Sequence, residues 1–103
     1  MNQLNSIILE GNLKGKPKVL KEGDRNNGLS FKIGVERYTK DREGNPVQSV
    51  SVFEIRAFGL LGETCYKNLK PKRGVRIVGR LAKDKSKVYV LAEHVEFKVY
   101  TGK

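Results

Sequence analysis

Strict alternation of apolar and polar side chains constrains the fold of this chain more than any other feature of its sequence. In residues 29–38, apolar residues occupy every second position from Leu29 to Val35, and polar residues or glycine fill the positions between them. A period of two places these apolar side chains on one face of a half-buried β-strand. The chain is therefore expected to build its core from β-sheet.

Four further segments have the character of strands, and one has that of a helix. With 29–38, the expected strands are residues 6–13, 47–58, 75–83 and 87–99, joined by turn-rich or polar connections at 14–28 and 39–46 and by a tight hairpin at 84–86. Residues 60–69 form the one expected helix, because Leu61, Cys65 and Leu69 recur every four residues. This order predicts an all-β, five-stranded OB-fold barrel, in a single domain spanning residues 1–103, with one short helix between strands 3 and 4. An SH3-like barrel is the alternative, but it lacks a helix of this length in that position.

The third expected strand ends in two well-defined faces. Phe53, Ile55 and Ala57 are expected to point into the core. The opposite face places Arg56 and Phe58 two residues apart on the outside of the barrel. An exposed aromatic ring beside a guanidinium suits single-stranded nucleic acid, because every nucleobase has a π-face that can stack on it. Periodicity equally allows Phe58 to turn under the helix as a core residue.

The fourth expected strand is also two-faced. Val75, Ile77 and Leu81 are assigned to one face, and Arg76 and Arg80 to the other. Together with the lysines of the hairpin that follows, these arginines could border a groove along a sugar–phosphate backbone. Taken singly, each is better explained as a solvated surface charge than as a contact, and the case for a groove depends on the whole set.

The charge of the chain indicates a polyanionic partner. Lys and Arg number 21 against 11 Asp and Glu, which gives a formal net charge of +10. Nucleic acid is the leading partner, because the basic residues are interleaved with aromatic ones. Tyr38 could stack on a base, although it could also be an ordinary strand-end tyrosine. The candidate nucleic-acid contacts are Phe58, Tyr38, Arg56, Arg37, Lys32, Lys40, Arg42, Arg76, Arg80, Lys83, Lys87, Tyr89, Lys14 and Lys16.

The same sequence argues against an enzyme, a metalloprotein or a secreted protein. His94 is the single histidine and Cys65 the single cysteine, so a zinc site of the usual kind cannot form. No phosphate loop, nucleophile elbow or paired carboxylate motif occurs. We therefore expect no catalytic residues, no metal and no cofactor. The lone cysteine and the lack of a signal peptide or membrane-spanning run predict a cytoplasmic protein, at the nucleoid if the source is bacterial.

Several stretches resemble the bacterial single-stranded DNA-binding protein family (SSB). They are residues 5–13, 31–35, 53–59 with Leu61 and Glu63, 74–81, and 92–97, in the family's order and over nearly the whole chain. The resemblance implies an OB-fold subunit, usually a homotetramer, that binds single-stranded DNA in replication, repair and recombination. It also places Phe58 on the DNA-stacking phenylalanine of the family. An outer aromatic earlier in that strand is Val52 here, and the aromatic after the second strand corresponds to Tyr38 or Thr39.

Three departures from the family pattern matter. The hairpin between the last two strands is short and lacks the family's aromatic residue. The sequence ends at Lys103 without a glycine-rich linker or acidic tip, so tail-mediated recruitment of partner enzymes is not expected. Gly15, Lys16 and Pro17 stand where the family often has an acidic residue in its first loop. With few aromatic residues, Lys and Arg must carry more of the binding than is usual for the family.

Two alternatives remain open at this level. Primosomal replication protein N has a similar length and the same barrel, lacks the tail and is a dimer, although its motifs match less well around residues 53–59. The other alternative is a structural module that uses its sheet edge for protein assembly, with the charge incidental. Binding to single-stranded DNA, and the size of the assembly, would distinguish these possibilities.

Overall fold

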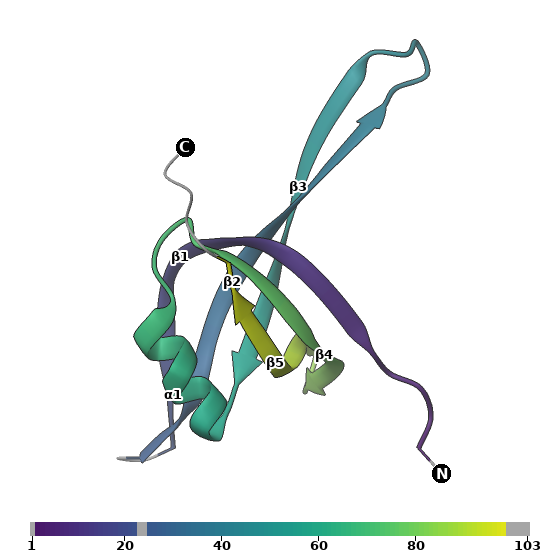
Figure 1. Ribbon diagram of the computed structural model, residues 1–103. Helices are drawn as coiled ribbons and strands as arrows, with labels where there is room; N and C mark the ends of the chain where they lie inside the picture. Colours follow the sequence, from purple (N-terminus) through teal and green to yellow (C-terminus); the bar gives the residue numbers. More distant parts are fainter. Residues whose placement is uncertain (1, 23–24, 99–103) are drawn as a thin grey trace.

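The computed structural model describes residues 2–22 and 25–98, without the side chains of residues 22, 25 and 26. In the described residues, five strands form a closed barrel with a single helix between the third and fourth strands, as the sequence predicts (Figure 1). The elements are β1 (Ile7–Glu22), β2 (Arg25–Lys40), β3 (Pro46–Ala57), α1 (Gly59–Asn68), β4 (Gly74–Asp84) and β5 (Lys87–Phe97). The strand order around the barrel is β1-β2-β3-β5-β4, the arrangement of an OB-fold.

One short contact between two strands closes the barrel. All other neighbours pair in antiparallel fashion, but β3 and β5 run parallel and pair only at Ile55 with Val90 and at Arg56 with Leu91. The strand β1 is long and bent, so that its first half pairs with β4 and its second half with β2. This closure brings β3 and β5, which are separated by the helix and β4 in sequence, onto the same wall.

The core consists of the inward side chains predicted by alternation, completed by the helix. On β2, Phe31 and Ile33 are at most 2% exposed. The helix α1 packs against β2, β3 and β5 through the stripe that contains Cys65. Among the described residues, the buried apolar side chains are those of Leu13, Leu29, Phe31, Ile33, Ile55, Ala57, Cys65, Leu69, Val75, Ile77, Val90, Ala92 and Val95. Burial of this apolar surface is the main favourable contribution to folding.

The predicted turn-rich connection at residues 14–28 is wrong for most of its length. Instead, β1 continues to Glu22 and β2 begins at Arg25, and residues 23–24 lie outside the described part of the chain. A bulge between Lys14 and Lys18 accommodates Gly15, which has a φ of 73°, and the proline that follows two residues later. A bulge bends a strand without ending it, so glycine and proline here mark a bend in β1 rather than a loop.

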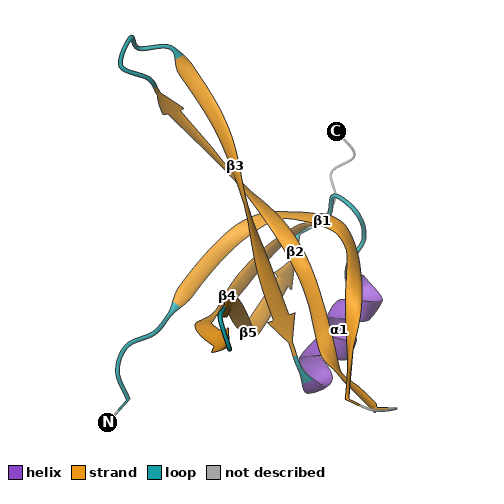
Figure 2. Ribbon diagram, turned by 180° about the vertical axis from the view of Figure 1, so that it is seen from behind, coloured by secondary structure: helices purple, strands orange, loops and turns teal. Residues whose placement is uncertain are grey.

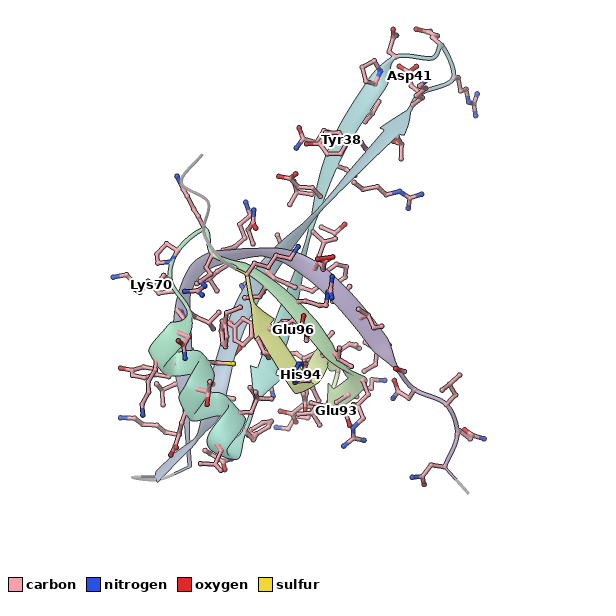
Figure 3. The ribbon with its side chains drawn as sticks, viewed as in Figure 1. Tyr38, Asp41, Lys70, Glu93, His94 and Glu96 are labelled. Carbon is pink, nitrogen blue, oxygen red and sulfur yellow. The ribbon has the colours of Figure 1, made fainter. Side chains whose placement is uncertain are left out.

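The strands β2 and β3 extend beyond the barrel as a two-stranded ribbon (Figure 2). Their pairing runs without interruption to Lys40 and Pro46, so the connection expected at 39–46 is only residues 41–45. Asp41 fixes this turn, because its Oδ1 atom accepts hydrogen bonds from the backbone N–H groups of Glu43 and Asn45 at 2.9 and 2.8 Å. Figure 3 shows Asp41 at the tip of the ribbon, far from the barrel.

Two residues assigned to the core are exposed instead. Phe53 is 39% exposed and Leu81 is 49% exposed. Phe53 lies on the inward face, but it precedes the short β3–β5 pairing that begins at Ile55, so no further strand covers it. Leu81 lies past the last β1–β4 pair. On that side the side-chain amide of Asn5 takes the place of a strand and makes two hydrogen bonds of 2.9 Å to the backbone of Leu81. Alternation therefore gave the correct face of each strand but not where the barrel ends.

A bulge in β5 decides which of its side chains point outward. Opposite Gly79 the register skips Glu93, which is the additional residue. The extra residue shifts the alternation of side chains by one position. Ala92 before the bulge and Val95 after it therefore both point inward, although they are three residues apart. As a result, odd-numbered residues near the start of β5, including Tyr89, face outward.

Candidate nucleic-acid interface

One wall of the barrel collects outward-pointing side chains from β1, β2, β3 and β5, and we call it the β3 face. It consists of Lys14, Lys32, Glu54, Arg56, Phe58 and Tyr89. The register places Lys32 between Lys14 on one neighbouring strand and Glu54 on the other. Paired strands lie about 4.8 Å apart, so these side chains are direct neighbours. The structure thus assembles basic and aromatic residues from four separate segments into one surface.

Phe58 lies at the junction of β3 and α1, outside the buried core. It immediately precedes the helix, with extended backbone angles of −120° and 162°, and its side chain is 36% exposed. One part of the ring rests on Gly28 of β2, where a Cβ atom would come within 2.5 Å of the ring. The remaining surface of the ring is open to solvent. Phe58 is therefore held in place by the backbone of β2 and retains an accessible aromatic surface.

Tyr38 lies on the ribbon, on the same side of the β2–β3 pair as Phe58. The uninterrupted register pairs Tyr38 with Gln48 and Gly34 with Val52, so Tyr38, and not Thr39, shares its side with the outer residues of β3. Its side chain is 70% exposed, and its hydroxyl donates a hydrogen bond of 3.3 Å to Glu36 (Figure 3). The ribbon thus holds the tyrosine well beyond the barrel wall.

Arg56 contacts three other side chains, those of Tyr89, Glu54 and Asp84. Its Cζ atom lies 4.1 Å from the centroid of the Tyr89 ring. Its Nε atom donates a hydrogen bond of 2.7 Å to Glu54, and its Nη1 atom lies 3.6 Å from Asp84 at the end of β4. The hydroxyl of Ser30 donates a further hydrogen bond of 3.0 Å to the same Glu54 oxygen.

This network stabilises the ionised forms of its members. The hydrogen bond from Arg56 holds the pKa of Glu54 below its usual value, with Ser30 adding to the effect and partial burial opposing it. The same hydrogen bond raises the pKa of Arg56. The guanidinium is therefore a permanent cation whose charge is already balanced by two carboxylates.

Three predicted contacts on the ribbon lie in different directions. Lys40 shares the side of Tyr38, whereas Arg37 pairs with Ser49 on the opposite side. Arg42 lies in the turn at the tip. All of these basic side chains are exposed, but the ribbon does not gather them into one patch.

Arg76 lies on another wall, formed by β1, β4 and β5. There it pairs with Glu10 and Glu96 at 3.4 and 3.5 Å, and Lys98 also contacts Glu10. The hydrogen bond from Lys98, reinforced by Arg76, lowers the pKa of Glu10. Arg76 is thus paired with acidic groups of β1 and β5, whereas Lys14 and Lys32 of the β3 face have no ion pair with an acidic side chain among the described residues.

The remaining candidates border the β3 face or lie near it. Arg80 pairs with Leu91, which in turn pairs with Arg56, so Arg80 lies two strands from Arg56 in the same lateral row. Lys83 and Lys87 are exposed on the short hairpin between β4 and β5, in which residues 85–86 form the turn. Lys16 is exposed in the bulge of β1.

The residues considered for catalysis form no catalytic cluster in the described part of the chain. His94 is exposed on β5 and lies 3.6 Å from Glu96 (Figure 3). Within residues 2–22 and 25–98, no three acidic, histidine or cysteine side chains come together as a metal site would require. The helix α1 is also too short to cross a membrane, and it is the one helix among these residues.

The thiol of Cys65 is expected to be chemically inert in the folded protein. It is completely buried, and this burial raises its pKa to about 11. At pH 8 only about one thiol in a thousand is then ionised, and the thiolate is the reactive form. Alkylation by iodoacetamide, followed by mass spectrometry, is expected to be roughly a hundredfold slower in buffer than in concentrated urea, where the thiol regains an ordinary pKa. Equal rates in both solutions would show that packing of α1 against the barrel does not shield this residue.

Comparison with known protein families gives a match over almost the whole chain. Residues 4–99 match the Single-strand binding protein family. The chain belongs to this family. The comparison with curated protein sequences, in contrast, finds no match.

Solved structures of proteins from the single-strand binding family share this fold. An SSB from Plasmodium falciparum, solved in complex with single-stranded DNA, has a TM-score of 0.81 at 17% identity, covering 96% of this chain and 98% of that one. A small single-stranded DNA-binding protein from Streptomyces coelicolor has a TM-score of 0.70 at 19% identity, covering 96% of both chains. A deletion mutant of the Thermus aquaticus protein has a TM-score of 0.80 at 22% identity, covering 97% of this chain but only 53% of that one. At these identities, the structural likeness establishes the common fold.

Sequence reasoning assigned no role to the acidic and hydroxyl partners in the β3 face. Alternation placed Glu54 on the outer face of β3, but nothing in the sequence connected it with Ser30 on the neighbouring strand or with Asp84. Asp84 was attributed to turn formation, whereas it is the last residue of β4 and reaches Arg56. The signal available in the sequence was Glu54 two residues before Arg56 on the outer face of the same strand.

Proposed function

We propose that this chain binds single-stranded DNA without sequence preference. The observation that supports this most strongly is the β3 face, where the half-exposed ring of Phe58 lies on the same wall as the exposed Lys14 and Lys32. Phe58 stacks on a base, and the lysines neutralise neighbouring phosphates. Tyr38 supplies a second aromatic contact from the ribbon.

The other basic residues extend this surface in two directions. Lys40 and Arg42 continue it along the ribbon, and Arg80, Lys83 and Lys87 continue it across the β4–β5 hairpin. Arg37 and Lys16 reach the strand from the margins, while Arg76 contributes to the general positive field rather than to a contact. Binding of this kind needs no catalytic group, and the protein acts by covering and protecting the strand.

The biological setting follows from family membership. The protein protects single strands during DNA replication, repair and recombination, in the cytoplasm. It acts as a homo-oligomer, a tetramer or alternatively a dimer. The exposed Ile8, 68% accessible on the outside of β1, supports an assembly of this kind. Size-exclusion chromatography with light scattering distinguishes the two assemblies.

Titration with oligo-dT at several salt concentrations tests the proposed function. Each phosphate neutralised on a single strand lowers the logarithm of the association constant by about 0.7 for every tenfold rise in salt. Four lysine contacts would therefore weaken binding by roughly 600-fold over one decade of salt. Duplex DNA of the same length is expected to bind much more weakly, because its bases are not free to stack.

Two results would contradict this proposal. Equal affinity for duplex and single strand would show that charge alone drives the interaction. No binding at low salt would favour a structural module whose charge is incidental.

A further inference from the structure

The guanidinium of Arg56 lies over the aromatic ring of Tyr89. Its Cζ atom lies 4.1 Å above the centroid of Tyr89, within the range of a cation–π contact. One face of the guanidinium is therefore covered by the ring. The side chain as a whole is 14% exposed, so it is neither buried nor freely mobile.

Two positions on the edge of this guanidinium already face carboxylates. All five N–H donors of an arginine lie in the guanidinium plane and point outward from its edges. Here Nε donates to Glu54 at 2.7 Å, and Nη1 lies 3.6 Å from Asp84. A bidentate phosphate contact through Nε or Nη1 would have to displace a carboxylate. A phosphate at the remaining Nη2 donors would meet repulsion from the nearby Glu54 and Asp84.

The contacts of this network involve the edge of the guanidinium and the face toward Tyr89, and none of them involves the flat face directed away from Tyr89. A guanidinium plane can stack on a nucleobase as an aromatic ring does. Arg56 and Phe58 are two residues apart on the same side of β3, which corresponds to about 6.6 Å along a strand. Successive bases of an extended strand could therefore rest on the two side chains.

We propose that Arg56 is a stacking platform for a nucleobase, held flat on Tyr89 by Glu54 and Asp84, and not a phosphate contact. This inference rests on the proposed binding of single-stranded DNA and assigns a specific role to one residue of that surface. Arg56 contributes affinity that depends on the bases and is insensitive to salt. The lysines of the β3 face contribute affinity that depends on the phosphates and falls with salt.

The test compares Arg56→Lys with the unaltered protein on two ligands, oligo-dT and an abasic oligonucleotide of the same length. Lysine keeps the charge and can still pair with Glu54, but it has no flat surface. Stacking contributes about 1–3 kcal/mol per base, so R56K is expected to bind oligo-dT roughly 5- to 100-fold more weakly. Its affinity for the abasic strand and its salt slope are expected to stay unchanged.

Lys32→Gln is the matched control on the neighbouring strand, and it should weaken binding of both ligands and lower the salt slope by about 0.7. Tyr89→Leu is a second variant, which removes the ring beneath the guanidinium and keeps all charges. It should reproduce the selective loss on oligo-dT, even if R56K does not fold. Folding of each variant is checked by thermal unfolding.

The possible failures are distinguishable. If the unaltered protein does not bind oligo-dT, the proposed function itself is wrong. If it binds and R56K matches it on oligo-dT, or loses equal affinity on both ligands, the platform is overturned while the function stands. If binding of oligo-dT by Arg56→Gln depends less steeply on salt concentration than binding by the unaltered protein, Arg56 is a phosphate contact and the platform is overturned.

Discussion

Phe58→Ala is expected to weaken binding of oligo-dT by roughly 5- to 100-fold while the barrel remains folded. The expected factor corresponds to the 1–3 kcal/mol that stacking on one aromatic ring contributes. Phe58 can lose its ring without opening the core, because it is 36% exposed and lies outside the buried cluster. The substitution removes the packing of the ring against Gly28 but none of the buried core cluster. Fluorescence titration and thermal unfolding measure the two effects separately.

Phe31→Ala is the matched control for this substitution. Phe31 is 2% exposed, and truncating a fully buried phenylalanine lowers the free energy of unfolding by about 3–5 kcal/mol. F31A should therefore unfold at a clearly lower temperature than the unaltered protein. Where F31A remains folded, its affinity for DNA should be unchanged. If F58A destabilises the protein as much as F31A does, Phe58 is a core residue and its assignment as a stacking residue is wrong.

Gly79→Ala is expected to lower the free energy of unfolding by about 1–3 kcal/mol, the usual cost of forcing an extra group into a packed interior. Gly79 lies opposite the bulge of β5, where β4 approaches its partner closely. A Cβ atom at this position would lie 2.1 Å from the carbonyl oxygen of Leu91 and 3.2 Å from the Cα atom of Ala92. Both are backbone atoms, so the two strands must move apart to accommodate the methyl group. Urea denaturation measures the loss.

Gly74→Ala, in the same strand, serves as the control. A Cβ atom there would meet the flexible side chain of Lys98 at 3.3 Å and the Asn12 side chain at 3.5 Å. Both neighbours can adjust, so we expect little change in stability. Equal destabilisation by the two substitutions would mean that β4 is intolerant of alanine in general and that the close approach at Gly79 is not special.

Much of the barrel could be predicted from local patterns in the sequence. The apolar positions of β2 from Leu29 to Ile33 are buried as the alternation indicated. Cys65 in α1 and Leu69 just after its end are buried as their spacing of four indicated. The errors occurred where local signals have two structural outcomes. Gly15 and a nearby proline were taken as a loop, but a bulge absorbs them inside β1.

The candidate site was predictable as a set of residues but not as a surface. Alternation placed Arg56 on the outer face of β3 and left Phe58 open between that face and the core, and the charge pointed to a polyanion. It could not place Arg76 on a different wall, among Glu10 and Glu96. The alternation of residues also could not show that Tyr89 lies beneath Arg56. That contact depends on the pairing of β3 with β5 and on the bulge in β5.

The sequence by itself determined which elements form and, for most positions, whether a side chain points inward or outward. These properties are local, because the direction of a side chain follows from a period of two along its own strand. Only the tertiary structure decided which outward side chains become neighbours, where the barrel ends and leaves Phe53 exposed, and which cations are already paired. These properties depend on strand register and closure, which are set by contacts between segments distant in the chain.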